Sequence, residues 1–479
     1  MDATRIDLYQ LTSLVAHHAA GHSDDPVVMS FFSRRLPRDV ATGRPVRGLL
    51  LFAGLGRCLD HLERARFDGP RIDALLAHPM LGPALARQPE LVERLRAWRF
   101  SGAIRAPREG TPLVAGAAIR LDGTPLAVDG VYPAAYCPYL EVETDLLSAK
   151  LIETPLLSTI NHMTMVASKA LRVVRAARAQ GSGRSVLEFG TRRTHPAAAI
   201  DAAIAAYVAG CSATSNVEAY ASHGVPVSGT MDHFAIQAWE RDGVPRHQTE
   251  EAFFRAFHEL FPGRDVLLVD TYDTFGAQTG IRAAVAATDS AGPAGIRLDS
   301  ALTRENIQRA RRLLDELGAT QTRIYVSGGM DEHKIAELGD VPIDGYGIGE
   351  RIVTSPDAPV GVGAVGKLSE VRGQPTMKLS RGSGKATLPG RLQVWRTASV
   401  DRVGRLGEDH PGEPLLEPVW TRQGGRLPGP SLDEVRAHAA RSVAALPPEA
   451  LLDRQAKLQI SDALARLVEA CIERASHSS

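Results

Sequence analysis

The sequence predicts an α/β fold: an irregular, TIM-like parallel α/β barrel with a flanking α+β domain that we expect to be an open-faced sandwich. Two observations in the middle of the chain favour the barrel. Short aliphatic runs recur there, each followed by a polar or glycine-rich turn, and helical patterns alternate with them. Strand and helix that alternate over about 160 residues are typical of a parallel sheet, and a closed barrel fits the number of units.

The expected strands share β-branched or aliphatic residues. They are Ser185–Phe189, Val225–Ser228, Val266–Val269, Gly295–Leu298, Arg323–Val326 and Asp344–Ile348. Two of the helices between them have clear ends. The helix expected over Pro196–Ala209 has proline in its first turn and Gly210 after its end. The helix expected over Leu302–Leu317 repeats apolar side chains at helical spacing and is followed by Gly318.

The two ends of the chain have a mixed pattern. Helix-like and strand-like stretches alternate in the first part: Leu8–Ala20, Val27–Phe32, Arg71–Ala77, Glu90–Trp98, Thr111–Leu113 and Ala117–Leu121. From about Lys367 onward, short strands and loops precede helices expected at Leu432–Ala445 and Asp453–Ala475. We therefore expect an N-terminal α+β flanking domain over 1–140 and a catalytic barrel over 141–368. Residues 369–479 should form short strands and helices that pack on the flanking domain.

Composition excludes several classes of protein. The 479 residues are 44% apolar, which is enough for two or three cores. Basic and acidic residues number 55 each, so the bulk charge indicates neither a nucleic-acid nor a membrane partner. The N-terminus has no apolar signal core, and no run of about 18 apolar residues occurs. The four cysteines are far apart, so we expect reduced thiols and a cytoplasmic protein: Cys58, Cys137, Cys211 and Cys471.

Charged and small residues follow the expected strands. They are Arg192 and Arg193, Thr230 and His233, Asp270 and Asp273, Arg297 and Asp299, Ser327, Gly328 and Gly329, and Gly347 and Gly349. Active sites of α/β barrels lie at the C-terminal ends of the strands, so we expect these residues to share one face. The need for polar turns explains the glycines, but it explains the arginines, aspartates and histidine less well.

These residue types indicate sugar-phosphate chemistry. Glycine turns at 327–330 and 347–349 let backbone amides approach a phosphate closely. Carboxylates at Asp270, Asp273 and Asp299 can stabilise a sugar cation or hold Mg²⁺ on a pyrophosphate, and helix capping is the alternative for Asp273 and Asp299. His233 has three candidate roles: structural hydrogen bonding, proton transfer and acceptance of a phosphoryl group. The segment 381–385 does not complete a nucleotide-binding loop, because alanine follows its lysine.

The chain resembles the nicotinate phosphoribosyltransferase family over essentially its whole length. The resemblance rests on ordered motifs that start with Asp7–Thr12, which reads DLYQLT. The others are Phe31–Pro37, Glu153–Leu157, Glu188–Arg193, Thr214–Val217, Gly224–Thr230, Leu268–Thr274, Gly295–Ser300, Ile343–Lys367 and Thr387–Arg391.

The resemblance implies that phosphoribosyl pyrophosphate reacts with nicotinate to give nicotinate mononucleotide and pyrophosphate, as in NAD salvage. It further implies that ATP, as co-substrate, drives the reaction through a phosphohistidine at His233. Tyr9 would stack on the pyridine ring from the neighbouring subunit of a homodimer, while Thr230 and Arg297 hold the carboxylate. The three aspartates would line the ribose and the pyrophosphate, which brings Mg²⁺ with it rather than binding it in a protein cage. The phosphate cradle implied is Arg192, Arg193, Ser327, Gly328, Gly329, Gly347 and Gly349.

Four motifs depart from the family pattern. Glu350 stands where the family has threonine, and Asp232 precedes His233. Ala301-Leu302 replaces a Gly-Asp pair, and Thr194-His195-Pro196 follows the two arginines. These departures keep two alternatives open. One is a diverged phosphoribosyltransferase that acts on another heteroaromatic acid in a specialised biosynthetic pathway, without ATP coupling. The other is a non-catalytic homologue that binds a nucleotide or a partner protein.

Overall fold

The computed structural model describes residues 3–34, 36, 48–181, 183–288, 291–354, 362–397, 400–446 and 458–477. The chain forms two compact units. The flanking unit comprises Met1–Ser168 and Val360–Ser479, and the parallel-sheet unit comprises Lys169–Pro359. Helix α6 (Leu146–Ala179) begins in the first unit and ends in the second.

The limits of the units differ from the domain limits expected at 140 and 368. Strands β7 (Leu140–Asp145) and β14 (Ala364–Val371) both pair with β1 (Pro26–Ser33), so both belong to the flanking unit. Residues from both ends of the chain therefore build one sheet.

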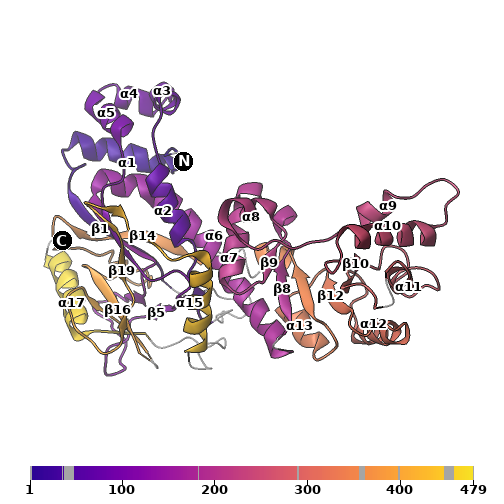
Figure 1. Ribbon diagram of the computed structural model, residues 1–479. Helices are drawn as coiled ribbons and strands as arrows, with labels where there is room; N and C mark the ends of the chain where they lie inside the picture. The colour runs from indigo at the N-terminus through magenta and orange to yellow at the C-terminus, as the bar shows by residue number, and fades with distance from the viewer. Residues whose placement is uncertain are drawn as a thin grey trace. The chain divides into compact units, whose positions relative to one another are not determined.

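Six strands of the described residues form the parallel sheet of the second unit (Figure 1). They are β8 (Ser185–Glu188), β9 (Ala213–Thr214), β10 (Val266–Leu268), β11 (Gly295–Leu298), β12 (Arg323–Ser327) and β13 (Gly345–Ile348). Their order is β10-β11-β12-β13-β8-β9, and all neighbours run parallel. The C-terminal ends of the strands thus lie along one edge. The prediction of an α/β fold with a parallel sheet is confirmed.

The expected strand Val225–Ser228 is not a regular strand. Its residues form an isolated parallel bridge, in which Val227 pairs with Thr214 of β9. The Thr214 amide donates to the Pro226 carbonyl at 2.9 Å, and the Ser228 amide donates to the Thr214 carbonyl at 2.8 Å. The segment therefore lies beside β9 and leads directly into Thr230.

Helices of the parallel-sheet unit connect these strands, and their ends follow local sequence rules. Pro196 occupies the first turn of α7, where a missing amide donor costs little, and Asn216 caps α8 by accepting from the Ala219 amide. Thr303 caps α12, which buries Ile307 and Leu314. The helices are η1 (Thr191–Arg193), α7 (Pro196–Val208), α8 (Val217–His223), α9 (His233–Gln237), α10 (Arg246–Leu260), α11 (Ile281–Ala286), α12 (Arg304–Glu316), α13 (Glu332–Leu338) and α14 (Glu350–Val353).

A seven-stranded antiparallel sheet forms the core of the flanking unit, in the order β15-β14-β1-β7-β3-β19-β20. Besides β1, β7 and β14, its strands are β3 (Ala103–Ala106), β15 (Gln374–Pro375), β19 (Glu417–Thr421) and β20 (Gly425–Arg426). Strand β1, paired on both sides, buries Phe31 and Phe32 completely. Large aromatic side chains of this kind contribute strongly to a core.

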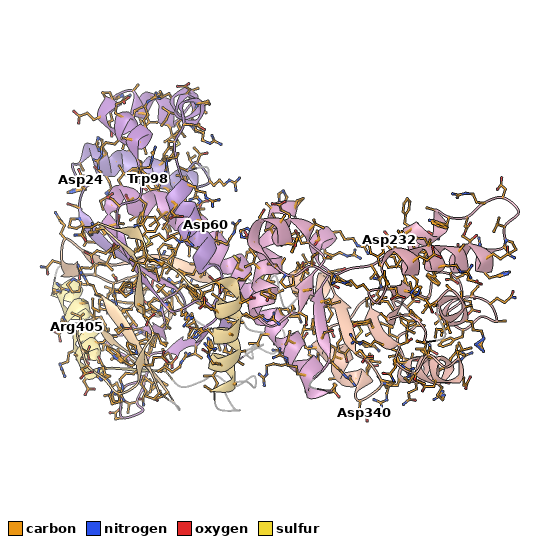
Figure 2. All side chains as sticks on the ribbon, viewed as in Figure 1. Asp24, Asp60, Trp98, Asp232, Asp340 and Arg405 are labelled. Atoms are coloured by element: carbon orange, nitrogen blue, oxygen red, sulfur yellow. The ribbon has the colours of Figure 1, made fainter. Side chains whose placement is uncertain are left out.

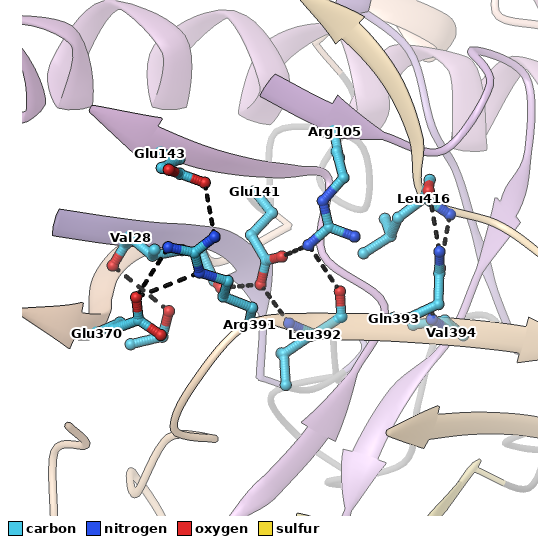
Figure 3. A network of polar contacts seen from close by, with 12 residues as sticks. Val28, Arg105, Glu141, Glu143, Glu370, Arg391, Leu392, Gln393, Val394 and Leu416 are labelled. Carbon is cyan, nitrogen blue, oxygen red and sulfur yellow. Dashed lines mark hydrogen bonds and ion pairs between the residues drawn. The ribbon is translucent and has the colours of Figure 1, made fainter. Parts of the chain in front are cut away.

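A polar network crosses this sheet and ties it to β16 (Leu392–Arg396), as Figure 3 shows. The buried carboxylate of Glu141 accepts from the Arg105 guanidinium and from the Leu392 amide, the latter at 2.8 Å. Arg391 donates to Glu370 and forms an ion pair with Glu143 at 2.9 Å. Burial raises the pKa of Glu141 to about 7, against the attraction of Arg105. These contacts join strands that lie far apart in the sequence.

The remaining strands of the flanking unit form three small sheets. A mixed sheet has the order β18-β16-β17-β21, and two antiparallel two-stranded sheets join β2 with β4 and β5 with β6. The strands are β2 (Leu50–Leu51), β4 (Pro112–Leu113), β5 (Ala115–Ala117), β6 (Ala134–Tyr136), β17 (Asp401–Arg405), β18 (Glu413–Pro414) and β21 (Leu458–Ile460).

Helices of the flanking unit include α1 (Leu8–Ala19), which buries Leu11 and Leu14 and exposes Tyr9. Within the described residues, no helix combines the length and apolar character needed to cross a membrane. The other helices are α2 (Leu55–Arg64), α3 (Gly69–Ala77), α4 (Leu81–Leu85), α5 (Pro89–Ala97), α15 (Leu432–Ala444) and α17 (Asp462–His477).

Two expected elements of the flanking unit were wrong in part. Residues 458–460 of the expected helix Asp453–Ala475 are strand β21, which pairs in parallel with β17, and α17 starts only at Asp462. Residues 453–457 lie outside the described part of the chain. The expected strand Ala117–Leu121 is reduced to one residue of β5 and a bridge at Ile119. In both cases pairing with a distant segment overrides the local pattern.

Candidate active site

A cavity of about 410 Å³ opens at the C-terminal ends of the strands in the parallel-sheet unit. Figure 2 labels Asp232, one of the residues in its wall. The wall includes these residues expected from the sequence: Arg192, Arg193, Thr230, His233, Arg297, Asp299, Ser327, Gly328, Gly329, Gly347 and Gly349. Residues that follow β8, β11, β12 and β13 therefore meet in one place, as the strand-end argument predicts.

Arg297 is the principal cation inside the cavity. One of its terminal nitrogens donates to the Met231 carbonyl at 2.7 Å, and its Nε is buried with no hydrogen-bond partner among the described residues. Burial lowers the pKa of Arg297, while the carboxylates of Asp299 and Asp270 raise it. Arginine stays protonated in proteins, so Arg297 offers an unused charged donor to an anionic ligand.

Thr230 lies beside Arg297 in the wall, but its hydroxyl is already used. The Oγ1 atom donates to the carbonyl of Val266 in β10 at 2.7 Å. The same oxygen can still accept a hydrogen bond. A carboxylate ligand would therefore require the Thr230 hydroxyl to rotate, whereas Arg297 is ready to bind.

Asp299 is fixed by the turn after β12. The Ser327 hydroxyl donates to Asp299 Oδ1, and the Asp299 amide donates to Asp270 Oδ2 at 2.9 Å. Gly328 has φ +85°, and a Cβ there would lie 2.2 Å from the Asp299 carbonyl oxygen, so a larger residue is excluded. Gly329 has φ +64° and open space at its Cβ position. This turn therefore combines a fixed carboxylate with accessible backbone.

His233 is the first residue of α9. Its Nδ1 lies 3.1 Å from the Thr271 hydroxyl, and its Nε2 lies 4.0 Å from Asp270 Oδ1. The side chain of His233 is 41% exposed, so a ligand in the cavity can reach it. Asp232 caps this helix, because its Oδ1 accepts from the Ala235 amide at 2.9 Å. The unusual Asp232 thus has a structural role.

The rim of the cavity has charges of both signs. Arg192 and Arg193 of η1 and Arg351 of α14 are exposed cations that line it. Glu350 is exposed in the same wall, and no cation in the described residues bonds to its carboxylate. A free carboxylate beside a phosphate would repel it.

Three expected site residues lie outside the wall of this cavity. Asp270 is directly behind it: its side chain is 2% exposed and supports Asp299 and His233. Asp273 is exposed, and its Oδ1 accepts from the Phe275 amide at 3.0 Å, which is a turn-stabilising role. Tyr9 belongs to the flanking unit and is 57% exposed.

The sequence reasoning missed two buried carboxylates close to the site. Glu188 accepts from the Thr214 hydroxyl at 2.6 Å and from the Gly190 amide, so it fixes the start of the Arg192 turn. Glu250 of α10 is fully buried and accepts from the Gly280 amide at 2.8 Å, which fixes the loop that follows β10. Glu188 lies in a recognised motif, but nothing in the pattern distinguished Glu250.

Carboxylates lie close to Tyr9 in the flanking unit: burial raises the pKa of Tyr9, and the nearby Glu153 and Asp7 raise it further. Gln10 donates to Glu153 at 2.5 Å, and Lys367 lies 4.0 Å from the same carboxylate. Burial lowers the pKa of Lys367, and nearby cations, Arg34 among them, lower it further. In the described residues, no group of three or more His, Cys, Asp or Glu side chains is arranged to hold a metal ion.

Comparison with known proteins gives close relatives but no matching family model. A nicotinate phosphoribosyltransferase of Mycobacterium tuberculosis is 38% identical over 93% of this chain and 91% of its own length. The enzyme of that name from Bacillus subtilis is 34% identical over 81% of this chain and 72% of its own length. The crystal structure of human nicotinic acid phosphoribosyltransferase superposes with a TM-score of 0.76 at 25% identity, covering 97% of this chain and 99% of that one.

Proposed function

The chain belongs to the nicotinate phosphoribosyltransferase family, and we propose that it transfers a phosphoribosyl group from phosphoribosyl pyrophosphate to nicotinate. The products would be nicotinate mononucleotide and pyrophosphate, as in NAD salvage. The observation that carries this proposal is the buried, unpartnered Nε of Arg297 beside the fixed carboxylate of Asp299. The cavity thus offers a donor for an anionic acceptor next to a group that stabilises positive charge.

The proposed chemistry is a dissociative displacement at the ribose. Arg297 binds the nicotinate carboxylate and orients the pyridine nitrogen towards the anomeric carbon. Pyrophosphate leaves, and the carboxylates of Asp299 and Asp270 stabilise the developing ribosyl cation. The ring nitrogen attacks with its free lone pair, so no general base is required. Asp273 is the weakest member of this set, since its side chain caps a turn.

The glycine turns are proposed to bind the 5-phosphate. Gly328 and Gly329 follow β12, and Gly347 and Gly349 lie at the end of β13, where small residues expose backbone amides. Arg192 and Arg193 add charge at the rim. Mg²⁺ would enter with the pyrophosphate and neutralise part of its charge, and Asp299 is the carboxylate of the cavity best placed to meet it.

ATP coupling is proposed to use His233 as phosphoryl acceptor. The geometry that supports it is an exposed imidazole flanked by Thr271 and Asp270. A buried carboxylate beside an imidazole orients it and stabilises its protonated form. Hydrolysis of the phosphohistidine would make the condensation favourable.

We further propose a homodimer in which Tyr9 of one subunit stacks on the nicotinate of the other. Support comes from the exposure of Tyr9 and from the Glu153–Lys367 cluster beside it. Both are features that an active site shared between subunits would use. We place the enzyme in the cytoplasm, in keeping with its four free thiols.

The finer architecture is also a proposal. The parallel strands would close into an irregular, TIM-like barrel, because the segment 225–230 bonds to β9 through Pro226 and Ser228 and to β10 through Thr230. The seven-stranded sheet of the flanking unit would be the open-faced sandwich.

One alternative keeps specific support. Glu350 in the cavity wall favours a diverged enzyme that uses another heteroaromatic acid. The purified protein should be incubated with phosphoribosyl pyrophosphate, Mg²⁺ and a panel of aromatic acids, with and without ATP, and products read by mass spectrometry. We expect nicotinate mononucleotide, and more of it with ATP. Product only from another acid supports the diverged enzyme, and absence of any product supports a non-catalytic homologue.

Arg297 provides the sharper test. Arg297→Ala should raise the KM for nicotinate by about 30-fold or more, the effect of losing a charge-assisted hydrogen bond. Arg312→Ala, an exposed position on helix α12 outside the cavity wall, is the control. An unchanged KM for nicotinate in Arg297→Ala contradicts the proposed acceptor site.

A further inference from the structure

The flanking unit contains a second cavity, of about 500 Å³, which shares no residue with the active-site cavity. Helix α15 (Figure 1) forms one wall through His438, Arg441 and Ser442. The loop before β4 adds Arg108 and Thr111, and the end of β16 adds Arg396. We call it the α15 cavity. Three arginines from separate parts of the chain therefore face one space.

The three arginines differ in how they are bound. Arg396 makes a two-pronged ion pair with Asp401, at 2.8 and 2.6 Å, and also donates to the Pro112 carbonyl. Its charge is compensated and its position fixed. By contrast, the side chains of Arg108 and Arg441 have no hydrogen-bond or ion-pair partner within the described part of the chain. Two guanidinium groups are thus free to bind an anion.

The potential at His438, on the α15 wall of the cavity, is positive. The pKa of His438 falls to about 4 because the ring is partly buried and because Arg108, Arg441 and Arg396 lie close to it. The imidazole is therefore neutral at pH 7, and it bonds to the Thr111 hydroxyl at 3.0 Å. The Ser442 hydroxyl, 3.3 Å from the ring, is a further donor in the wall.

The opposite wall has a different character. Glu413 and Glu417 are exposed carboxylates there, and Pro414, Leu415 and Leu446 add apolar surface. Carboxylates repel a simple anion but accept hydrogen bonds from hydroxyl groups, as they do from a ribose. A cavity of this size suits a small organic molecule rather than a single oxyanion.

We propose that the α15 cavity binds a nucleoside phosphate. Its phosphate would contact Arg108 and Arg441, its ribose hydroxyls would donate to Glu413 or Glu417, and its base would lie against the apolar wall. Such a site would let a nucleotide bind the flanking unit independently of the reaction proposed above.

The test uses AMP, which is neither substrate nor product of that reaction, and the full-length protein. Binding is measured by calorimetry, and its place by hydrogen exchange of α15. We expect AMP to slow exchange over 432–444. The double variant Arg108→Ala/Arg441→Ala should weaken binding about tenfold or more and abolish this protection. Both side chains are exposed, so the fold should persist, and an unchanged Tm checks it. Arg436→Ala, on the same helix but outside the wall, should bind AMP normally.

Further arms separate the parts of the ligand. The double variant Glu413→Gln/Glu417→Gln should weaken the binding of AMP but not the binding of inorganic phosphate. Equal protection of α15 by inorganic phosphate and AMP would overturn the nucleoside assignment. AMP binding that is unchanged in the double arginine variant, or that leaves α15 exchange unaltered, would overturn the site itself.

Discussion

The Nε2 atom of His233 lies 4.0 Å from Oδ1 of Asp270, and that oxygen is buried with no hydrogen-bond partner among the described residues. The other oxygen of Asp270 accepts from the Asp299 amide and the Ser300 hydroxyl. A small rotation of the imidazole would complete the pair. One buried carboxylate therefore supports both the proposed phosphoryl acceptor and the proposed stabiliser of the ribosyl cation.

This relationship predicts the behaviour of His233→Ala. ATP should no longer stimulate nicotinate mononucleotide formation, whereas the slower reaction without ATP should continue, because the imidazole serves only the phosphoryl step. Product formation with and without ATP measures the effect. His247→Ala, on α10 and outside the cavity wall, should respond to ATP as the parent protein does. Stimulation that survives in His233→Ala would falsify the phosphohistidine.

Because Asp232 caps α9, two substitutions can test its charge and its capping role separately. Asp232→Asn keeps a good cap but removes a negative charge beside the proposed phosphoryl acceptor, so ATP stimulation should rise two- to fivefold, as expected for about 0.5–1 kcal/mol. Asp232→Ala also removes the cap and should destabilise α9 by about 1 kcal/mol. Initial rates with and without ATP measure the effect of the charge, and hydrogen exchange of residues 233–237 measures the loss of the cap. Equal rates in the parent and Asp232→Asn mean that the charge has no effect on the phosphoryl transfer.

Much of the candidate active-site cavity could be predicted from the sequence, because a parallel sheet places the residues that follow its strands along one edge. Arg297, Asp299 and Ser327 follow adjacent parallel strands, so the parallel sheet alone brings them together. Local patterns could not predict that Asp273 would cap a turn, or that Glu250 would reach the loop after β10 from a helix. Those contacts depend on how loops fold back, which the period of hydrophobic residues does not record.

The same distinction explains the errors in the fold. The central strands and helix α12 have clear periodicity and defined ends, and they were predicted to within a few residues. Strand β21 is three residues long and exists because β17 pairs with it. The exact ends of the two units depend on the pairing of β1 with both β7 and β14, which lie more than 200 residues apart in the sequence.

We predict that substitution of Glu350 strengthens the binding of phosphoribosyl pyrophosphate. Glu350→Thr removes an exposed negative charge from the cavity wall and adds a hydroxyl donor, so phosphoribosyl pyrophosphate should bind severalfold more tightly. Calorimetric titration with phosphoribosyl pyrophosphate and Mg²⁺ gives the Kd. Glu316→Thr, an exposed position on α12, is the matched control. No change in the Kd means that the Glu350 carboxylate points away from the phosphate.

We predict that Glu250 makes the free energy of unfolding depend on pH. Burial raises its pKa from 4.5 to about 7, so between these values the folded protein keeps a proton that the unfolded chain releases. The stability that this proton confers is complete below about pH 4.5 and is lost as the pH rises through about 7. Glu250→Gln mimics the protonated form at every pH.

The free energy of unfolding of Glu250→Gln should therefore be close to that of the parent protein at pH 4.5 and exceed it at pH 8. The upper limit of the difference at pH 8 is about 3–4 kcal/mol, because the pKa of Glu250 rises from 4.5 to about 7. Urea unfolding at both pH values measures it. Glu251→Gln, the next residue on α10 and an ion-pair partner of Arg255, should show no such gain at pH 8. Parallel pH profiles for the parent and Glu250→Gln would show that Glu250 is ionised in the folded state and that another group stabilises the loop after β10.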